Sequence, residues 1–285
     1  MDTISQILKS LHFAANIYLH SEFCSPWSAE SDNPGMSSFH VIAYGNCSLR
    51  IPGRDEIQLN AGDLIFFPRN ISHEIANPRN DAEISTTLIC GRLDFQKANH
   101  PILTALPDVI HIQAHAMTAY PWLQSLFQHI VNEAESGIEG RQMILDRLSE
   151  ILFIYIVRYY LLAMAETAEQ TSGLLAGLNH PQICKSLQAI HLDLGKPWTV
   201  ASLAELAGMS RAAFADKFNQ LIGQTPLQYL TLWRMQSAHQ ALSMTDQSIL
   251  EIALDHGYQS EAAFNKAFKK MFAMTPGKSR KHERS

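Results

Sequence analysis

The sequence of 285 residues has few cysteines, no long uninterrupted apolar run and little net charge. Its four cysteines are Cys24, Cys47, Cys90 and Cys184. None of them forms a Cys-x-x-Cys pair, and such sparse cysteine is typical of a reducing compartment. The most apolar stretch, residues 151–165, is interrupted by Arg158 and is too short to span a bilayer. Because residues 1–10 also lack a secretory-signal pattern, we expect a cytoplasmic protein with no membrane partner.

The small net charge of −5 hides an asymmetry between two parts of the chain. From residue 185 to the end there are 12 Lys and Arg residues against 8 Asp and Glu residues, a net charge of +4. The preceding 184 residues carry 10 basic and 19 acidic side chains, a net charge of −9. Because attraction to phosphate is local to a surface, the acidic total does not exclude a nucleic-acid partner.

The basic part contains an internal repeat with a period of 50 residues. The matching pairs are Ser210 and Ser260, Phe214 and Phe264, Phe218 and Phe268, and Pro226 and Pro276. In each copy an apolar helix, at 200–207 and 249–256, runs into a glycine, and a serine follows at the N-cap of a second helix. This pattern predicts two helix-turn-helix units, at 200–221 and 249–272. One helix over 226–244 would hold their recognition helices about 34 Å apart, one turn of DNA.

The outward positions of the second helix in each unit are the candidate readers of DNA bases. They are Arg211, Ala212, Ala215 and Asp216 in the first unit, and Glu261, Ala262, Asn265 and Lys266 in the second. Arginine pairs with guanine, asparagine with adenine and a carboxylate with cytosine, whereas alanine contacts only thymine methyl groups. For Asp216 and Glu261 the alternative is compensation of the helix dipole or solvation.

Basic residues gather in the last 20 positions of the chain. They are Lys266, Lys269, Lys270, Lys278, Arg280, Lys281 and Arg284. Such a cluster predicts contacts to DNA phosphates, which supply affinity and not sequence preference. The alternative is a solvated helix end.

The acidic part begins with a strand-rich region and continues with helices. Short alternating strands with turns over residues 36–115 predict a sandwich or small barrel. Residues 116–170 predict two helices separated between Gly137 and Gly140. The second is apolar on more than one face, so it must be covered by the barrel and its partner helix or by a dimer seam. Residues 171–182 are typical of a linker.

Two motifs resemble known families. The repeat, with Gly223-Gln-Thr-Pro226 and the pattern Ile252-Ala-x4-Gly-Tyr-x-Ser-x3-Phe-x3-Phe268, resembles the DNA-binding domain of AraC/XylS-type transcription regulators. The segment Ala61–His73, a glycine turn followed by a strand, a proline and His73, resembles the second cupin motif. These resemblances imply an α+β protein of several parts: a cupin-like β-barrel sensor domain over 1–115, a helical dimerisation segment over 116–170, a linker over 171–182 and an all-α AraC-type domain with two helix-turn-helix units over 183–285.

The family resemblance also implies function and partners. It implies a homodimer that binds double-stranded promoter DNA, contacts RNA polymerase and usually activates transcription. The layout around Cys24, His73 and Cys90 resembles a subgroup that responds to reactive chlorine, which implies oxidant sensing by Cys24 and Cys90. Taken alone, Cys90 ends an apolar run and reads as an inert core residue. Cys24 reads as part of a loop with no basic neighbour to lower the pKa of its thiol.

The competing hypothesis for sensing is a small-molecule effector pocket lined by His40 and His73. The alternative for these two residues is that they are buried histidines with hydrogen-bond partners. Many cupins bind a metal through several histidines and a carboxylate, but here the first motif offers only His40. We therefore expect no metal, no other cofactor and no catalytic residues. A cupin enzyme fused to a DNA-binding tail would need that metal set, and a DNA-repair protein would need a Pro-Cys-His-Arg acceptor site, which is absent.

Overall fold

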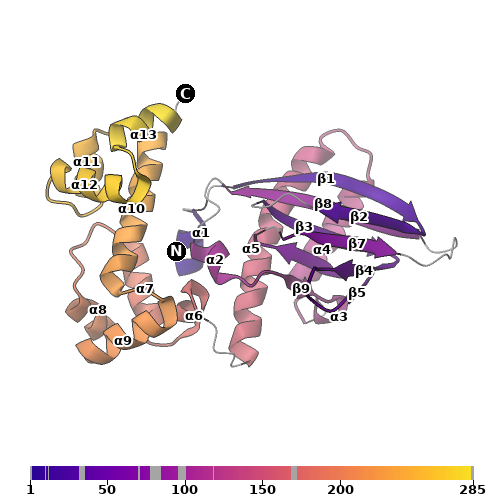
Figure 1. The fold of residues 1–285 in the computed structure, drawn as a ribbon, viewed down its shortest axis with the longest axis horizontal. Coiled ribbons are helices and arrows are strands. Elements are labelled where there is room, and N and C mark those ends of the chain that lie inside the picture. Colours follow the sequence, from indigo (N-terminus) through magenta and orange to yellow (C-terminus); the bar gives the residue numbers. More distant parts are fainter. Residues whose placement is uncertain are drawn as a thin grey trace. The chain divides into compact units, whose positions relative to one another are not determined.

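The computed structural model describes residues 2–9, 11, 13–31, 36–69, 71–77, 85–95, 101–117, 119–167 and 172–283. Two compact units are visible in Figure 1. The sheet unit contains residues 11–167, and the helical unit joins α1 (Thr3–Lys9) to residues 168–285. The predicted boundaries at residues 115, 170 and 182 stay a prediction, because contacts divide the chain only near residues 10 and 167. Within the described residues, no helix is both long and apolar enough to cross a membrane.

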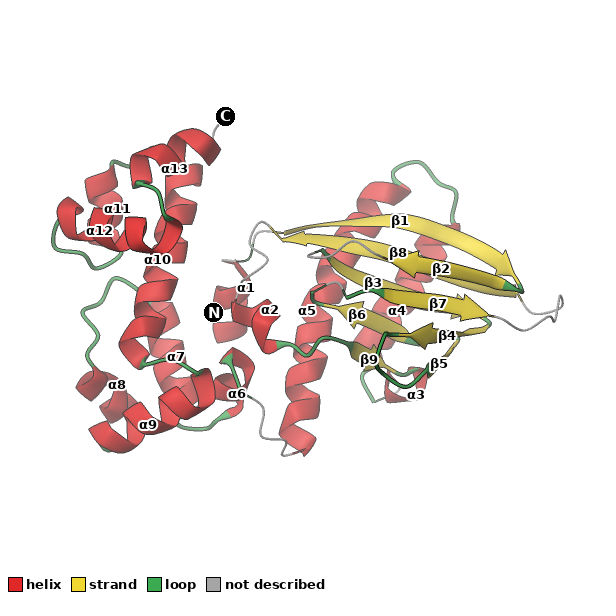
Figure 2. Cartoon of the chain, in the orientation of Figure 1, coloured by secondary structure: helices red, strands yellow, loops and turns green. Residues whose placement is uncertain are grey.

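The sheet unit is built from two antiparallel sheets (Figure 2). Its strands are β1 (Phe13–Cys24), β2 (Trp27–Ser31), β3 (Ser37–Tyr44), β4 (Asn46–Arg50), β5 (Ile57–Asn60), β6 (Leu64–Phe67), β7 (His73–Asn77), β8 (Ser85–Phe95) and β9 (Ile110–Ile112). The order is β1-β8-β3-β6-β9 in one sheet and β2-β7-β4-β5 in the other. The antiparallel sheets confirm the prediction that this region is built from short strands. The described strands do not close into the predicted barrel, because the two sheets share no hydrogen-bonded pair of strands.

Alternation along the central strands divides the core into two layers. On β3, His40 and Ile42 point with Cys90 of β8 into the space between the two sheets, where Leu49 and Ile75 also pack. The residues that alternate with these along the strands point to the other side of the sheet, towards helices. Phe66, for example, lies 5.8 Å from the ring of Phe153 on α5. Strand β3 is therefore buried along all but its last residue.

Two helices cover the outer side of the larger sheet (Figure 2). They are α4 (Pro121–Glu135) and α5 (Arg141–Thr167), and α5 packs on β1 and on α4. The predicted break between them is confirmed: Gly137 and Gly140 have φ angles of 63° and 87°, a left-handed conformation that glycine adopts without strain.

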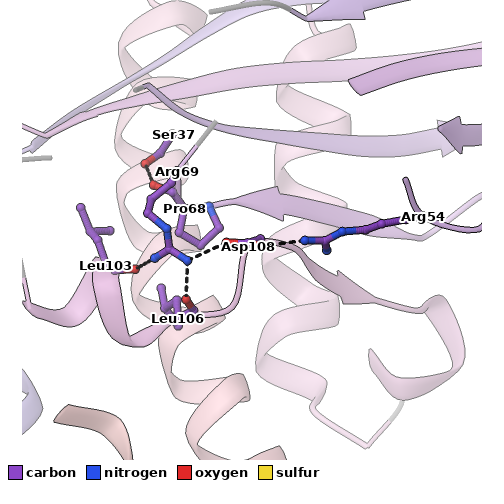
Figure 3. Close-up of polar contacts among 7 residues, drawn as sticks. All are labelled: Ser37, Arg54, Pro68, Arg69, Leu103, Leu106 and Asp108. Carbon is purple, nitrogen blue, oxygen red and sulfur yellow. Dashed lines mark hydrogen bonds and ion pairs between the residues drawn. The ribbon is translucent and has the colours of Figure 1, made fainter. Parts of the chain in front are cut away.

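An arginine network fixes the segment that contains α2 (Pro101–Ala105), β9 and α3 (Ala114–Met117) (Figure 3). The guanidinium of Arg69 donates to the carbonyl oxygens of Leu103 and Leu106 and to Oδ1 of Asp108, the last over 2.9 Å. Arg54 donates to the other carboxylate oxygen of Asp108 over 2.7 Å. Arg69 and then Arg54 hold the pKa of Asp108 below its usual value, so this carboxylate stays charged between two cations.

The helical unit follows the repeat seen in the sequence. Besides α1 it contains α6 (Leu174–Asn179), α7 (Ile183–Leu192), α8 (Val200–Ala207), α9 (Arg211–Ile222), α10 (Pro226–Met244), α11 (Ile249–Asp255), α12 (Glu261–Phe272) and α13 (Pro276–Glu283). As predicted, Gly208 and Gly257 are left-handed, and the hydroxyls of Ser210 and Ser260 accept from the backbone N–H three residues on.

Three predictions about local structure need correction. Strands begin at residue 13 and not at 36, so Cys24 ends β1 and does not lie in a loop. The stretch predicted as a linker contains α6, whose Leu174 and Leu175 are buried, because this apolar pair packs with α7 and α9. Helix α1, which the sequence placed with the strand-rich region, packs on α7 through buried Ile7 and is grouped by its contacts with the helical unit.

Candidate functional site

Helices α9 and α12 present equivalent surfaces. Their phenylalanine pairs, Phe214 with Phe218 and Phe264 with Phe268, are fully buried. The opposite face carries the predicted readers. The exposed readers are Arg211, Ala212 and Asp216 on α9 and Glu261, Ala262 and Lys266 on α12; Lys269 and Lys270, predicted to contact phosphates, are exposed on α12 as well. Ala215 and Asn265 occupy equivalent positions and are half-buried. The structure therefore leaves most of the predicted readers available to a partner.

Two of the predicted DNA contacts have a polar atom that is buried or hydrogen-bonded within the unit. The side-chain oxygen of Asn265 is buried and finds no hydrogen-bond partner among the described residues, so it is turned away from the surface. Arg280 is half-buried, and its Nη2 donates to the carbonyl oxygen of Gln247 over 2.6 Å. This bond ties α13 to the loop between α10 and α11. Arg284 lies outside the described residues.

The sheet unit brings three of the predicted sensing residues together. Nδ1 of His40 lies 3.0 Å from Sγ of Cys90, and Nε2 of His40 lies 2.9 Å from Nε2 of His73. Nδ1 of His73 lies 2.7 Å from the carbonyl oxygen of Ile71. All three side chains are buried. They form a continuous chain, which we name the Cys90–His40–His73 relay.

The end of the relay fixes the direction of each hydrogen bond. A carbonyl oxygen only accepts, so Nδ1 of His73 carries the proton, and Nε2 of a neutral His73 must accept. His40 therefore donates from Nε2 to His73 and accepts at Nδ1 from the thiol of Cys90. Every ring nitrogen in the relay then has a partner without any net charge.

Burial keeps His40 and Cys90 neutral. It lowers the pKa of His40 to about 3, with a smaller effect of the same sign from His73. Burial also raises the pKa of the Cys90 thiol to about 12, and nearby Cys47 adds to the increase. The pKa of Cys47 is itself raised to about 12, mainly by burial. Cys90 is thus a thiol and not a thiolate at neutral pH.

Cys24 differs from Cys90 in exposure and is distant from it. It is exposed, whereas Cys90 is buried. In the pairing of β1 with β8, Cys24 lies opposite Ser85 and Cys90 lies opposite Leu19. Five residues of strand separate the two positions, about 17 Å. A disulfide requires Cα atoms within about 7 Å, so this fold does not allow a Cys24–Cys90 bond within one chain.

Among the described residues, the side chains around His40 and His73 do not supply the ligand set of a cupin metal centre. His40 and His73 face each other through Nε2 but use those atoms for their mutual hydrogen bond. A metal normally needs three or four protein ligands. In the part of the chain that the structure describes, no group of three or more His, Cys, Asp or Glu side chains is placed to hold an ion.

A pocket of about 340 Å³ borders the outer end of the relay. It is lined by Glu30, Arg50, Ile51, Pro52, Ser72, His73 and Glu74. Of the two histidines predicted to line an effector pocket, His73 borders this cavity and His40 does not, and the effector role of both stays a prediction. The sequence motifs assign no role to Glu30 and Arg50, which also line this cavity. The alternation along Trp27–Ser31 indicates a strand there, but their approach to β7 depends on pairing across the sheet.

Comparison with known proteins agrees with both units. A cupin family model matches residues 2–162, and a helix-turn-helix domain model matches residues 203–282. The chain is 32% identical to the HTH-type transcriptional regulator AlkR of Acinetobacter baylyi over 97% of this chain and 98% of AlkR. It is 30% identical to the RCS-specific HTH-type transcriptional activator RclR of Escherichia coli over 100% of this chain and 99% of RclR.

Among solved structures, the DNA-binding domain of AdpA in complex with a target DNA is 31% identical, with a TM-score of 0.35. It covers 36% of this chain and 93% of that chain. The predicted function, transcription regulation through DNA binding, is confirmed by the full-length relatives. The chain belongs to the AraC-type family of DNA-binding transcription regulators that carry an N-terminal cupin domain.

Proposed function

We propose that the two helical pairs, α8–α9 and α11–α12, are helix-turn-helix units that enter successive major grooves of promoter DNA. The supporting observation is their equivalence. Each pair has a left-handed glycine in its turn, and each has a serine N-cap followed by two buried phenylalanines four and eight residues later. Each then exposes the same positions on its second helix. Two copies of one surface joined by a single helix suit a partner that repeats along an axis, as duplex DNA does.

The exposed side chains divide into two roles. Arg211 on α9 and Glu261 and Lys266 on α12 are placed to read base edges, where arginine favours guanine and glutamate accepts from cytosine. Lys269 and Lys270 lie one turn further along α12 and contribute contacts to phosphates. Asn265 and Arg280 are secondary candidates, because their polar atoms are used or buried inside the unit.

Helix α5 supports a homodimer. Ile144, Ile151 and Leu162 are large apolar side chains with 47%, 42% and 42% of their surface exposed. They belong to a stripe with alternating spacings of four and three residues: Ile144, Leu148, Ile151, Tyr155, Arg158 and Leu162. This spacing is typical of a coiled-coil seam. We assign the stripe, here named the α5 seam, to the α5 helix of a second copy.

The sheet unit is the part that senses the signal. Two classes of signal stay open, an oxidant and a small molecule. Cys24 is exposed and open to an oxidant. The pocket beside His73 is of a size for a small effector whose binding reaches Cys90 through the relay. Either signal must interact differently with two states of the protein to change DNA binding. The named relatives are regulators, so we infer a regulator that makes contact with RNA polymerase and has no catalytic role.

Selection of DNA by the full chain tests this function. From a pool of random 35-base-pair duplexes, the wild-type chain should select a site with two boxes whose centres lie about 10.5 base pairs apart. Arg211→Ala should weaken binding by about 1–3 kcal/mol and relax the base preference at one position. Selection of no common sequence, or of a single box, would contradict the two-unit proposal.

A further inference from the structure

Arg234 lies in the middle of α10 and binds a loop of the first helical pair. Its half-buried guanidinium donates from Nε to the carbonyl oxygen of Leu194 over 2.6 Å. Its Nη2 donates to the carbonyl oxygens of Gly195, over 3.4 Å, and Lys196, over 2.7 Å. Three consecutive carbonyls thus share one planar fork, a geometry that lysine cannot reproduce.

The same loop touches the turn between α11 and α12. A Cβ on Gly195 would lie 2.5 Å from the carbonyl oxygen of Asp255. A Cβ on Gly257 would lie 2.5 Å from the carbonyl oxygen of Gly195 and 2.4 Å from Nη2 of Arg234. Neither position has room for a side chain. Two backbone segments and one guanidinium therefore meet in direct contact, and we name this meeting point the Arg234 clamp.

The clamp joins the two helical pairs. The loop at 193–198 leads directly into Thr199, the N-cap of α8 in the first pair. It is stiffened from within, because Asp193 accepts from the backbone N–H of Lys196 and from the indole of Trp198. The turn at Gly257 orients α12 in the second pair. The pairs are thus connected at two places, along α10 and through the clamp.

We propose that Arg234 is a positioning residue that sets the separation and relative orientation of α9 and α12, and with them the spacing between the two DNA boxes. This inference rests on the proposed function. A helical pair that is attached only through α10 can rotate about that connection. The Arg234 clamp is a second attachment between the two pairs and removes this freedom. One base pair of extra spacing rotates a box by roughly 34° about the DNA axis. A rigid pair of units therefore rejects a wrong spacing, whereas a loosened pair accepts it.

The test compares full-length chains on DNA that differs only in spacing. The probes are the duplex that the wild type selects, versions of it with the two boxes moved by one to five base pairs, and a duplex with one box alone. For the wild type we expect affinity to fall at least tenfold when the spacing changes by two base pairs. Arg234→Met should weaken binding to the duplex with the best spacing about tenfold, because a looser tether lowers the effective concentration of the second unit. It should flatten the spacing profile and leave single-box affinity unchanged.

Two further variants separate positioning from stability. Ser237→Ala removes the 3.0 Å contact between α10 and His256 at the end of α11. This contact does not involve the first pair or its loop, so the spacing profile of the variant should stay sharp. Gly195→Ala pushes the loop away from Asp255 and should flatten the profile as Arg234→Met does. The inference is overturned if both clamp variants keep the wild-type profile, or if they lose equally on single-box and two-box DNA. If the wild type itself selects no two-box site, the proposed function fails, and this inference fails with it.

Discussion

The thiol of Cys90 and Nδ1 of His40 lie 3.0 Å apart, although 50 residues separate them in the chain. The pairing of β3 with β8 places the two residues directly opposite each other. The thiol donates to a ring whose other nitrogen donates to His73. One of the two predicted redox cysteines is therefore a hydrogen-bonded member of the core, and the other, Cys24, is an exposed residue at a strand end.

Thiol labelling should separate these two cysteines. Cys24 should react with iodoacetamide at pH 7.5 in the native protein, whereas Cys90 should react only after unfolding. Raising a thiol pKa from 9.0 to about 12 lowers its thiolate fraction at neutral pH roughly 1000-fold, and burial excludes the reagent as well. Mass spectrometry of peptides sampled over time measures both rates, with Cys24→Ser as the control. Labelling of native Cys90 at the rate of Cys24 would show that the relay does not protect it.

The relay should also make the stability of the protein depend on pH. The pKa of His40 is about 3 in the folded protein and about 6.5 when unfolded, so between these values the unfolded chain binds a proton that the folded chain does not. His40 therefore costs no stability above pH 6.5 and destabilises the fold as the pH falls towards 3. The loss is at most about 1.4 kcal/mol per pH unit.

Urea unfolding between pH 7 and 4 measures this effect. His40→Gln should remove this component of the slope and should destabilise the protein by about 1–3 kcal/mol at pH 7, because the buried relay is left incompletely paired. His129→Gln, at an exposed position of α4, is the matched control and should leave the slope unchanged. The same slope in His40→Gln as in the wild type would assign the pH dependence to other groups.

The sequence predicted what depends on local chemistry. Helices at 200–207 and 226–244 were predicted with their observed bounds, because caps, glycines and apolar periodicity all lie within the helix itself. The relay could not be predicted, because its geometry depends on the register of strands that are far apart in sequence. Strand β1 carries a period-two pattern, with Ala15 and Ile17 buried between exposed Asn16 and Tyr18, although the predicted strands begin only at residue 36. The role of Arg234 could not be predicted either, because the apolar periodicity of this helix allows either Trp233 or Arg234 at the buried position.

The α5 seam gives a prediction about assembly. Ile151→Lys should convert a dimer into a monomer, because it places a second cation in the seam, beside its apolar residues Leu148 and Tyr155. Sedimentation of the full chain between 1 and 50 µM measures the change. The matched control is Ile138→Lys, an exposed isoleucine outside α5 that should leave the dimer intact. A wild type that stays monomeric over this range, or an Ile151→Lys variant that stays dimeric, would rule out the seam as the dimer interface.

The lysines of α12 give a prediction about salt. Each phosphate that a lysine neutralises releases about 0.9 counterions, so the slope of log K against log salt concentration counts such contacts. Lys269→Gln and Lys270→Gln should each reduce that slope by about 1 and should weaken binding to selected and unrelated duplexes alike. Lys185→Gln, on the exposed face of α7, carries the same change of charge at a site without a proposed contact and should keep the wild-type slope. Fluorescence anisotropy of full-length protein between 50 and 300 mM salt makes the comparison. If Lys269→Gln and Lys185→Gln change the slope equally, the effect reports net charge, and α12 does not form the phosphate contacts proposed for it.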